Sequence, residues 1–286
     1  MKNKKLRIIA LLFLISFINQ SLCSQADNVK VKLITNKGEM TIELFKETPL
    51  HSTNFIKLVE SGFYEGVSFH RVIKGFMAQA GDPNSKNETF SGKLGQESYG
   101  EVVAAEFNSK YYHKKGALCA ARKGDEVNPN KESSGSQFYL VQGKTYSKQL
   151  LENMASQINN KKKQALLVSY IQNPSNIDVL NKLQYYQQNN LQDSIAIFIE
   201  EIKPIATKHF NAFSFSEEAK STYTTIGGTP FLDGNYTVFG QVIEGLEVID
   251  EICNVKTLEE DIPEEDVIII SMKIMLNKVQ ETLEDK

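Results

Sequence analysis

The chain has 286 residues, of which 41% are hydrophobic and 23% are charged, and it contains no tryptophan. This apolar content is too high for a disordered protein, and the length fits one large domain or two small ones. Lysine and arginine number 32 against 35 acidic residues, which gives a net charge of −3. Because phosphate binding needs a basic surface, this balance argues against nucleic acid as a partner. Three cysteines are too few for a disulfide framework.

The first 26 residues are typical of a secretory signal peptide. A cationic segment over residues 2–7 precedes an apolar run over residues 8–18, which is too short to span a bilayer. The small residues Ser24 and Ala26 predict cleavage before Asp27. We therefore expect an exported protein that resides in a bacterial periplasm.

Cys23 offers an alternative to soluble export, because lipoprotein signals end at a cysteine that receives the lipid. The bulky Leu22 stands before it, where such signals carry a small residue. Lipid anchoring is therefore the less favoured alternative. No later apolar stretch is long enough to span a bilayer, so we expect no stable membrane insertion of the mature protein.

Alternating apolar residues from Val29 onward indicate strands with one buried face. Residues 29–34 and 40–44 alternate on either side of the turn sequence at 36–38, which predicts a hairpin. Thr48 then suits the N-cap of a helix that has Pro49 in its first turn. Gly62 is expected to end this helix.

Short segments separated by glycine follow along the chain. Further strands are predicted over residues 67–73, 76–81, 117–121, 137–142, 237–242 and 267–275, and a short second helix over 245–253. Many short strands with two helices predict a mainly β fold, a closed antiparallel barrel capped at its ends by helices.

Residues 143–223 interrupt this strand pattern. Glycine is absent from most of the segment, and apolar residues recur at helical spacing. They predict one or two helices over 150–170 and one each over 177–186 and 195–202. The strand pattern resumes at Thr224. We interpret the segment as an α-helical insertion in one discontinuous domain formed by residues 27–142 and 224–286.

The segment 68–83 carries the most informative pattern. Arg71 precedes a tight turn that ends at Gly75, and Met77 and Gln79 share one face of the strand that follows. The turn brings Arg71 back beside them. One cation and one amide therefore border an apolar patch.

Two further segments complete a recognisable set. In residues 134–140, Gln137 and Tyr139 share a strand face by the same alternation, and residues 231–242 form the third segment. In this order the three segments resemble a cyclophilin-type peptidyl-prolyl cis-trans isomerase of the bacterial exported type. The resemblance covers about residues 30–142 and 224–277.

The resemblance implies a fold, an activity and a partner class. The family fold is an eight-stranded antiparallel barrel with two capping helices and a groove on one side. Its substrates are proline-containing polypeptides, here unfolded or exported ones, and it uses no cofactor or metal. We expect the protein to act as a monomer.

The resemblance also assigns site residues. Arg71 matches the catalytic arginine, and Gln79 matches the glutamine that orients the arginine and the substrate carbonyl. The positions that match substrate-binding residues are Phe76, Met77, Ala121, Arg122, Gln137, Tyr139, Phe231, Leu232 and Tyr236. Ala121 and Arg122 correspond to positions that hold the peptide through backbone groups.

Three positions depart from the usual pattern. Tyr139 replaces a phenylalanine, Phe231 stands where animal cyclophilins have tryptophan, and Tyr236 stands where they have histidine. Because the tryptophan position bears on cyclosporin binding, we expect weak inhibition by this drug. The departures also leave open a non-catalytic proline-peptide-binding chaperone, although the intact Arg71, Met77 and Gln79 argue against it.

The other polar features have simple structural interpretations. We interpret His70 as a packed core histidine, because strand alternation turns it away from Arg71. His51, His113 and His209 have no cysteine or carboxylate at ligand spacing, which argues against a metal site. The acidic run over residues 259–266 is interpreted as a charged loop. The insertion is interpreted as a helical hairpin with an ordinary core, the alternative being that it flanks the groove.

Overall fold

The structure is a computed structural model that describes residues 28–87 and 89–275. The predicted signal peptide and Cys23 lie outside the described residues. The chain divides into two compact units. Among the described residues, the first unit comprises the chain up to residue 111 together with 116–141 and 234–275, and the second comprises 112–115 and 142–233.

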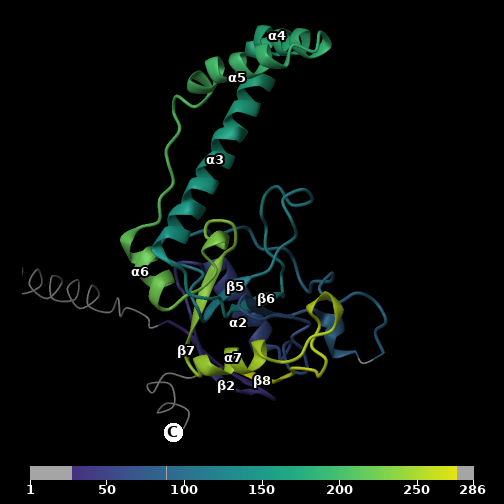
Figure 1. Ribbon diagram of the computed structural model, residues 1–286. Coiled ribbons are helices and arrows are strands. Elements are labelled where there is room, and N and C mark those ends of the chain that lie inside the picture. Colours follow the sequence, from purple (N-terminus) through teal and green to yellow (C-terminus); the bar gives the residue numbers. More distant parts are fainter. Residues whose placement is uncertain (1–27, 88, 276–286) are drawn as a thin grey trace, which may run out of the picture. The chain divides into compact units, whose positions relative to one another are not determined.

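The first unit is built on one sheet of eight strands, all paired antiparallel (Figure 1). The strands are β1 (Lys30–Thr35), β2 (Gly38–Leu44), β3 (Arg71–Ile73), β4 (Met77–Ala80), β5 (Ala117–Ala120), β6 (Phe138–Val141), β7 (Val238–Glu244) and β8 (Ile269–Met275). Their order in the sheet is β3-β4-β6-β5-β7-β2-β1-β8. The fold is thus mainly β, with the strands curled into a half-barrel.

Full closure of the barrel, which the sequence predicts, is not confirmed. The ladder has two edges, β3 and β8. The segments leading into these strands meet at an isolated bridge between Ser68 and Ile268, beside a 2.8 Å hydrogen bond from Phe69 N to Val267 O. Between β3 and β8 themselves, no ladder is found among the described residues.

The core lies between the sheet and two helices, as the sequence predicts. Helix α2 (Pro49–Glu60) and helix α7 (Leu246–Cys253) both bury an apolar face. The buried cluster they share with the sheet includes Val31, Leu33, Met40, Ile42, Phe55, Leu58, Ile249 and Ile252. At about 1.5–3 kcal/mol for each buried aliphatic or aromatic side chain, this cluster is the main source of stability in the first unit.

The start of α2 differs in one respect from the prediction. Thr48 occupies the N-cap position, but its side chain does not cap the helix. Its hydroxyl instead donates to Phe45 O at 3.2 Å. The helix N–H groups of Leu50 and His51 donate to the Glu106 carboxylate, at 3.1 and 3.0 Å. An acceptor from a distant loop therefore replaces the local cap.

The second unit is helical, as predicted for most of its length. Its helices are α3 (Lys148–Gln172), α4 (Ile177–Gln188), α5 (Gln192–Ala206) and α6 (Glu217–Thr225). Figure 1 shows α4 and α5 gathered at one end of α3, with α6 near the other. Nowhere in the described ranges does a helix have both the length and the apolar character needed to cross a bilayer.

The predicted helical stripes are only partly core. At the α6 end of α3, Leu151 packs with Tyr146, Phe215, Ala219 and Tyr223. In α4, by contrast, no residue is buried, and Leu151 is the sole buried residue of α3. Most of the periodic apolar positions of these two helices therefore lie at least partly exposed.

The two ends of the helical segment meet at Gly143 and Gly228, and we call this contact the glycine neck. Lys144 and Gly228 form an isolated β bridge, and Lys114 bridges the same glycine. A Cβ on Gly143 would lie 2.3 Å from Gly228 Cα, so the two backbones touch where only glycine fits. This contact explains why the second unit extends past the predicted boundary at residue 223.

Candidate functional site

Three predicted site residues stand in register across three neighbouring strands. Arg71 on β3 lies directly opposite Gln79 on β4, and Gln79 lies directly opposite Tyr139 on β6. Side chains at directly opposed positions of antiparallel strands project from the same face. The sequence prediction that the turn returns Arg71 to the side of Gln79 is therefore confirmed. Met77, two residues before Gln79, shares this face.

A chain of amide hydrogen bonds fixes the orientation of Gln79. The Gln137 Nε2 group donates to two backbone oxygens, Gly95 O at 3.1 Å and Glu97 O at 2.6 Å. Its Oε1 must then be the atom that accepts from Gln79 Nε2, at 2.8 Å. Gln79 is thus left with its own oxygen as an acceptor. Gln137 is buried, whereas Gln79 is half-buried.

The Arg71 guanidinium is half-exposed and has a carboxylate partner. Its Nε donates to Asp261 Oδ2 at 3.3 Å, and the two side chains are 44% and 42% exposed. Asp261 belongs to the acidic run at residues 259–266, which is a charged loop as interpreted. The ion pair itself was not predicted, because 190 positions separate the two residues and no local pattern links them.

Apolar side chains lie beside this row. Met77 and Tyr139 are buried, while Phe76 is half-buried at the turn between β3 and β4. The rings of Tyr139 and Tyr236 meet edge to face, with centroids 6.0 Å apart. The Arg122 guanidinium lies over the Tyr236 ring at 4.5 Å. These aromatic rings therefore form a wall beside the cation and the amide of the row described above.

Ala121 and Arg122 differ in what their backbones can offer a peptide. Ala121 N donates to Gln137 O at 3.0 Å, and Ala121 O accepts from Ser134 N at 2.8 Å. Within the described chain, no hydrogen bond is found for the Arg122 backbone, although its Nε donates to Asn235 O at 2.7 Å. The geometry therefore leaves the backbone of Arg122, more than that of Ala121, open to a ligand.

A pocket of about 830 Å³ adjoins the two glutamines. Its lining combines the strand residues Gln79 and Gln137 with the loops at 95–98 and 121–134, which contribute both apolar and charged side chains. A volume of this size is typical of a ligand site.

Phe231 and Leu232 lie in the second unit, in a short 3₁₀ helix η3 (Pro230–Leu232). Phe231 is 49% exposed. Leu232 N donates to Thr229 O at 3.0 Å, which holds the turn. Their assignment to a pocket wall stays a prediction.

His70, adjacent to Arg71, is buried as predicted. Burial lowers its pKa from 6.5 to about 4, with a smaller opposing effect from Asp82 and a smaller lowering effect from Arg71. Neither ring nitrogen has a hydrogen-bond partner within the described residues. The side chain is therefore a neutral packing group and not an acid or base of the site.

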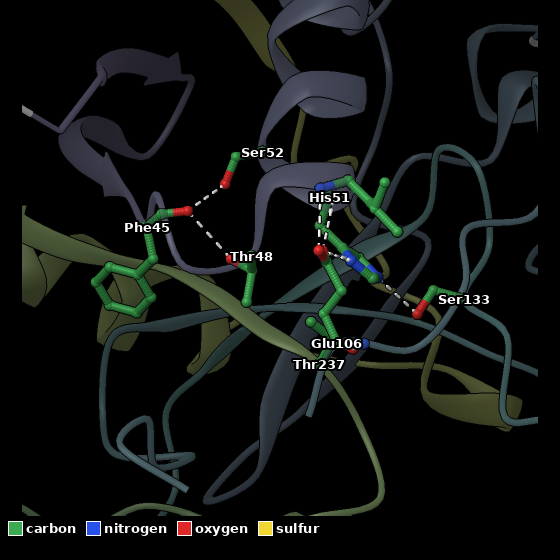
Figure 2. A network of polar contacts seen from close by, with 8 residues as sticks. Phe45, Thr48, His51, Ser52, Glu106, Ser133 and Thr237 are labelled. Atoms are coloured by element: carbon green, nitrogen blue, oxygen red, sulfur yellow. Dashed lines mark hydrogen bonds and ion pairs between the residues drawn. The ribbon is translucent and has the colours of Figure 1, made fainter. Parts of the chain in front are cut away.

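A buried polar network at the start of α2 escapes sequence reasoning. Figure 2 shows the Glu106 carboxylate beside both the backbone and the ring of His51, with Ser133 across the ring. His51 Nδ1 lies 2.7 Å from Glu106 Oε2, and Nε2 lies 2.9 Å from Ser133 Oγ. Burial lowers the pKa of His51, and Glu106 partly offsets this effect. The ring is then neutral, with Nδ1–H donating to the carboxylate.

This network resembles a nucleophile–histidine–carboxylate arrangement in its distances alone. Ser133 and His51 are both buried, so a substrate has no access to the hydroxyl. We assign it a structural role. Among residues 28–87 and 89–275, no three histidine, cysteine or acidic side chains gather in a way that could hold a metal ion.

Comparison with known proteins decides the family. The sequence profile described as cyclophilin type peptidyl-prolyl cis-trans isomerase/CLD matches residues 30–203 and 212–274. The chain belongs to the cyclophilin-type peptidyl-prolyl cis-trans isomerases. Similar proteins from Staphylococcus epidermidis (strain RP62A) and Staphylococcus aureus (strain COL), both named for this activity, are 32% and 30% identical over 251 residues. The match covers 87% of this chain and 93% of each relative.

Solved cyclophilin structures share the fold. A Cryptosporidium parvum cyclophilin type peptidyl-prolyl cis-trans isomerase aligns with a TM-score of 0.51 and 23% identity, covering 87% of this chain and 99% of the other. The same protein solved in the presence of the dipeptide Ala-Pro aligns with a TM-score of 0.50 and 22% identity.

Proposed function

We propose that this cyclophilin isomerises X–Pro bonds at the face formed by Arg71, Gln79 and Tyr139. The observation that supports this most is their register across β3, β4 and β6, which sets a cation and an oriented amide beside an aromatic wall. A strand-borne row of this kind keeps its geometry without help from a ligand.

The chemistry that this face must catalyse is a rotation. Twisting an X–Pro bond removes amide resonance and meets a barrier of about 18–20 kcal/mol. At the twisted state the proline nitrogen regains a lone pair, and no covalent bond is broken. A guanidinium directed at that nitrogen binds the twisted state better than the flat amide, which is the requirement for catalysis.

Magnitudes indicate that Arg71 acts together with its surroundings. A hydrogen bond to a charged group contributes about 1.5–3 kcal/mol. At about 1.36 kcal/mol per tenfold in rate, that is one or two powers of ten. The rest comes from holding the substrate, with the ring of proline against Phe76, Met77 and Tyr139 and the peptide carbonyl oriented near Gln79.

We further propose that the protein is exported and acts as a monomer on proline-containing unfolded polypeptides. The amino-terminal sequence pattern of residues 1–26 supports export. The mixed apolar and charged lining of the adjoining pocket suits an extended polypeptide more than a single small ligand.

The test is a protease-coupled assay with a proline tetrapeptide. We expect Arg71→Ala to lower kcat/KM by about ten- to a hundredfold, and Arg71→Lys to fail as well because lysine lacks the planar, multi-donor head. Lys74→Ala removes an exposed cation from the same turn and is the matched control. Wild-type activity in Arg71→Ala would contradict the proposal. Tight peptide binding by a wild type that does not isomerise would identify a chaperone instead.

A further inference from the structure

The acidic run near the C-terminal end of the chain forms a small hairpin whose tip reaches Arg71. Leu258 N donates to Ile262 O at 2.7 Å, and Glu264 N donates to Lys256 O at 2.9 Å. Thr257 and Pro263 form an isolated bridge between these bonds. We call residues 256–264 the acidic hairpin. Its backbone bonds fix the position of the tip, the 3₁₀ turn η4 (Glu259–Asp261).

The tip presents two neighbouring carboxylates, each of which is paired with a different cation. Asp261 accepts from Arg71 Nε at 3.3 Å, and Glu260 accepts from Lys93 Nζ at 2.8 Å. Both residues hold left-handed backbone angles, with φ of 61° at Glu260 and 64° at Asp261. Aspartate tolerates this conformation better than most side chains, whereas glutamate does not share that advantage.

We propose that Asp261 is a positioning residue for Arg71, an inference that rests on the proposed function. The bond engages Nε and leaves both terminal nitrogens of the guanidinium for the substrate. With Gln79 directly opposite on β4, the arginine is then bordered on one side by an amide and on another by a carboxylate. Its head is held in one orientation before a peptide arrives.

Orientation, more than charge, is what this contact supplies. Both side chains are more than two-fifths exposed, and ion pairs in such surroundings contribute little to stability. A long side chain without a partner samples several rotamers, and catalysis suffers when a reacting group is misplaced. The effect of losing Asp261 should therefore fall on kcat, with little change in KM or in the unfolding free energy.

The experiment compares three variants. Asp261→Gly removes the acceptor but tolerates the left-handed backbone angle. Asp261→Asn keeps an oxygen acceptor without the charge. The control, Glu260→Gly, makes the same substitution at the preceding residue, which contacts Lys93 and not Arg71. We expect Asp261→Gly to lower kcat by about fivefold or more with KM within about twofold of wild type. Asp261→Asn should recover most of the rate, and Glu260→Gly should match wild type.

A second readout does not depend on turnover. Of the three arginines in the sequence, only Arg71 and Arg122 lie among the described residues. In the mature chain their Nε–H groups should give two NMR signals, which Arg71→Ala would assign. The Arg71 signal should report a rigid group in wild type and Asp261→Asn and a mobile one in Asp261→Gly. Arg122, whose Nε donates to Asn235 O, serves as the internal reference.

The two readouts separate the possible failures. An unchanged Arg71 signal in Asp261→Gly, or a kcat equal to that of Glu260→Gly, would overturn the proposal. An Asp261→Gly variant faster than wild type would overturn it too, because the contact would then restrain the arginine. A wild type without isomerase activity would overturn the proposed function itself, and the NMR signals would still show whether Asp261 holds Arg71.

Discussion

Glu106 accepts hydrogen bonds from both the backbone N–H and the imidazole Nδ1 of His51, through the same oxygen, Oε2. Its other oxygen accepts from Leu50 N. One carboxylate therefore satisfies two unpaired N–H groups of the α2 terminus and fixes the tautomer of a buried histidine. Because α2 buries its apolar face in the core, this contact supports the fold and not the chemistry.

The first prediction concerns this carboxylate. Glu106→Gln replaces one of the two acceptor oxygens with a donor, so at least one charge-assisted hydrogen bond is lost and an N–H group is left without a partner. We expect the free energy of unfolding to fall by about 2–4 kcal/mol, measured by urea denaturation. Glu200→Gln is the control, since the exposed Glu200 pairs with Lys203 at 2.8 Å and its loss should cost less than about 1 kcal/mol. Equal losses in both would refute the assigned role.

The second prediction concerns pH and His70. The folded pKa of about 4 lies below the ordinary 6.5, so the unfolded chain binds the proton more readily between these values. Stability is therefore complete above about pH 6.5 and is lost as the pH falls toward 4, by roughly 3 kcal/mol at most. His70→Leu should flatten this part of the profile while folding normally, because no hydrogen bond is removed.

Urea denaturation at pH 7, 5.5 and 4.5 would test the effect as the difference between wild type and variant, which cancels the titration of carboxylates. His209→Gln, at an exposed histidine, controls for the loss of an imidazole. Parallel profiles for wild type and His70→Leu would contradict the prediction.

The third prediction concerns the amide chain. Gln137→Glu cannot donate to Gly95 O and Glu97 O, so the new carboxylate either turns away or takes up a proton. If it turns away, Gln79 loses the acceptor that orients it, and if it takes up a proton, that protonation costs free energy at neutral pH. We expect kcat/KM for a proline tetrapeptide to fall by about tenfold. Gln96→Glu places the same charge on the lining of the same pocket. If both variants lose activity equally, the cause is charge and not orientation.

The fourth prediction concerns the glycine neck. Gly143→Ala would place a Cβ 2.3 Å from Gly228 Cα at a φ of 62°. We expect a loss of unfolding free energy well above the roughly 1 kcal/mol that a left-handed alanine alone costs. Gly234→Ala isolates that smaller term, because its φ is 71° and no atom lies within 4 Å of the added Cβ. Thermal unfolding of the two variants gives the comparison, and similar melting temperatures would contradict it.

The sequence predicted those features that depend only on neighbouring residues, such as strand faces, tight turns and helices. The alternation around Met77 and Gln79 and the tight turn after Arg71 were enough to place these residues on one face. The capping helices followed from their apolar spacing and from Pro49. Residues 150–170 were also predicted to be helical, as one or two helices, but not how little of the single helix α3 is buried.

Contacts between segments that lie far apart in the chain could not be predicted from the sequence. Glu106 lies 55 positions from His51, and Asp261 lies 190 positions from Arg71, so no periodicity links either pair. An acidic loop has the same composition whether it faces water or an arginine. Closure of the barrel depends on whether the two edge strands, β3 and β8, pair with each other, and strand ends are where alternation predicts least.

The glycine neck has a consequence for how this protein can vary. Since Gly143 and Gly228 meet through their own backbones, the two ends of the intervening polypeptide are held together without any contact from the helices between them. The entropy of closing that loop rises only slowly with its length. The junction is therefore a natural graft point, where helices could be shortened, extended or exchanged for an unrelated guest domain while the strands on either side keep their pairing.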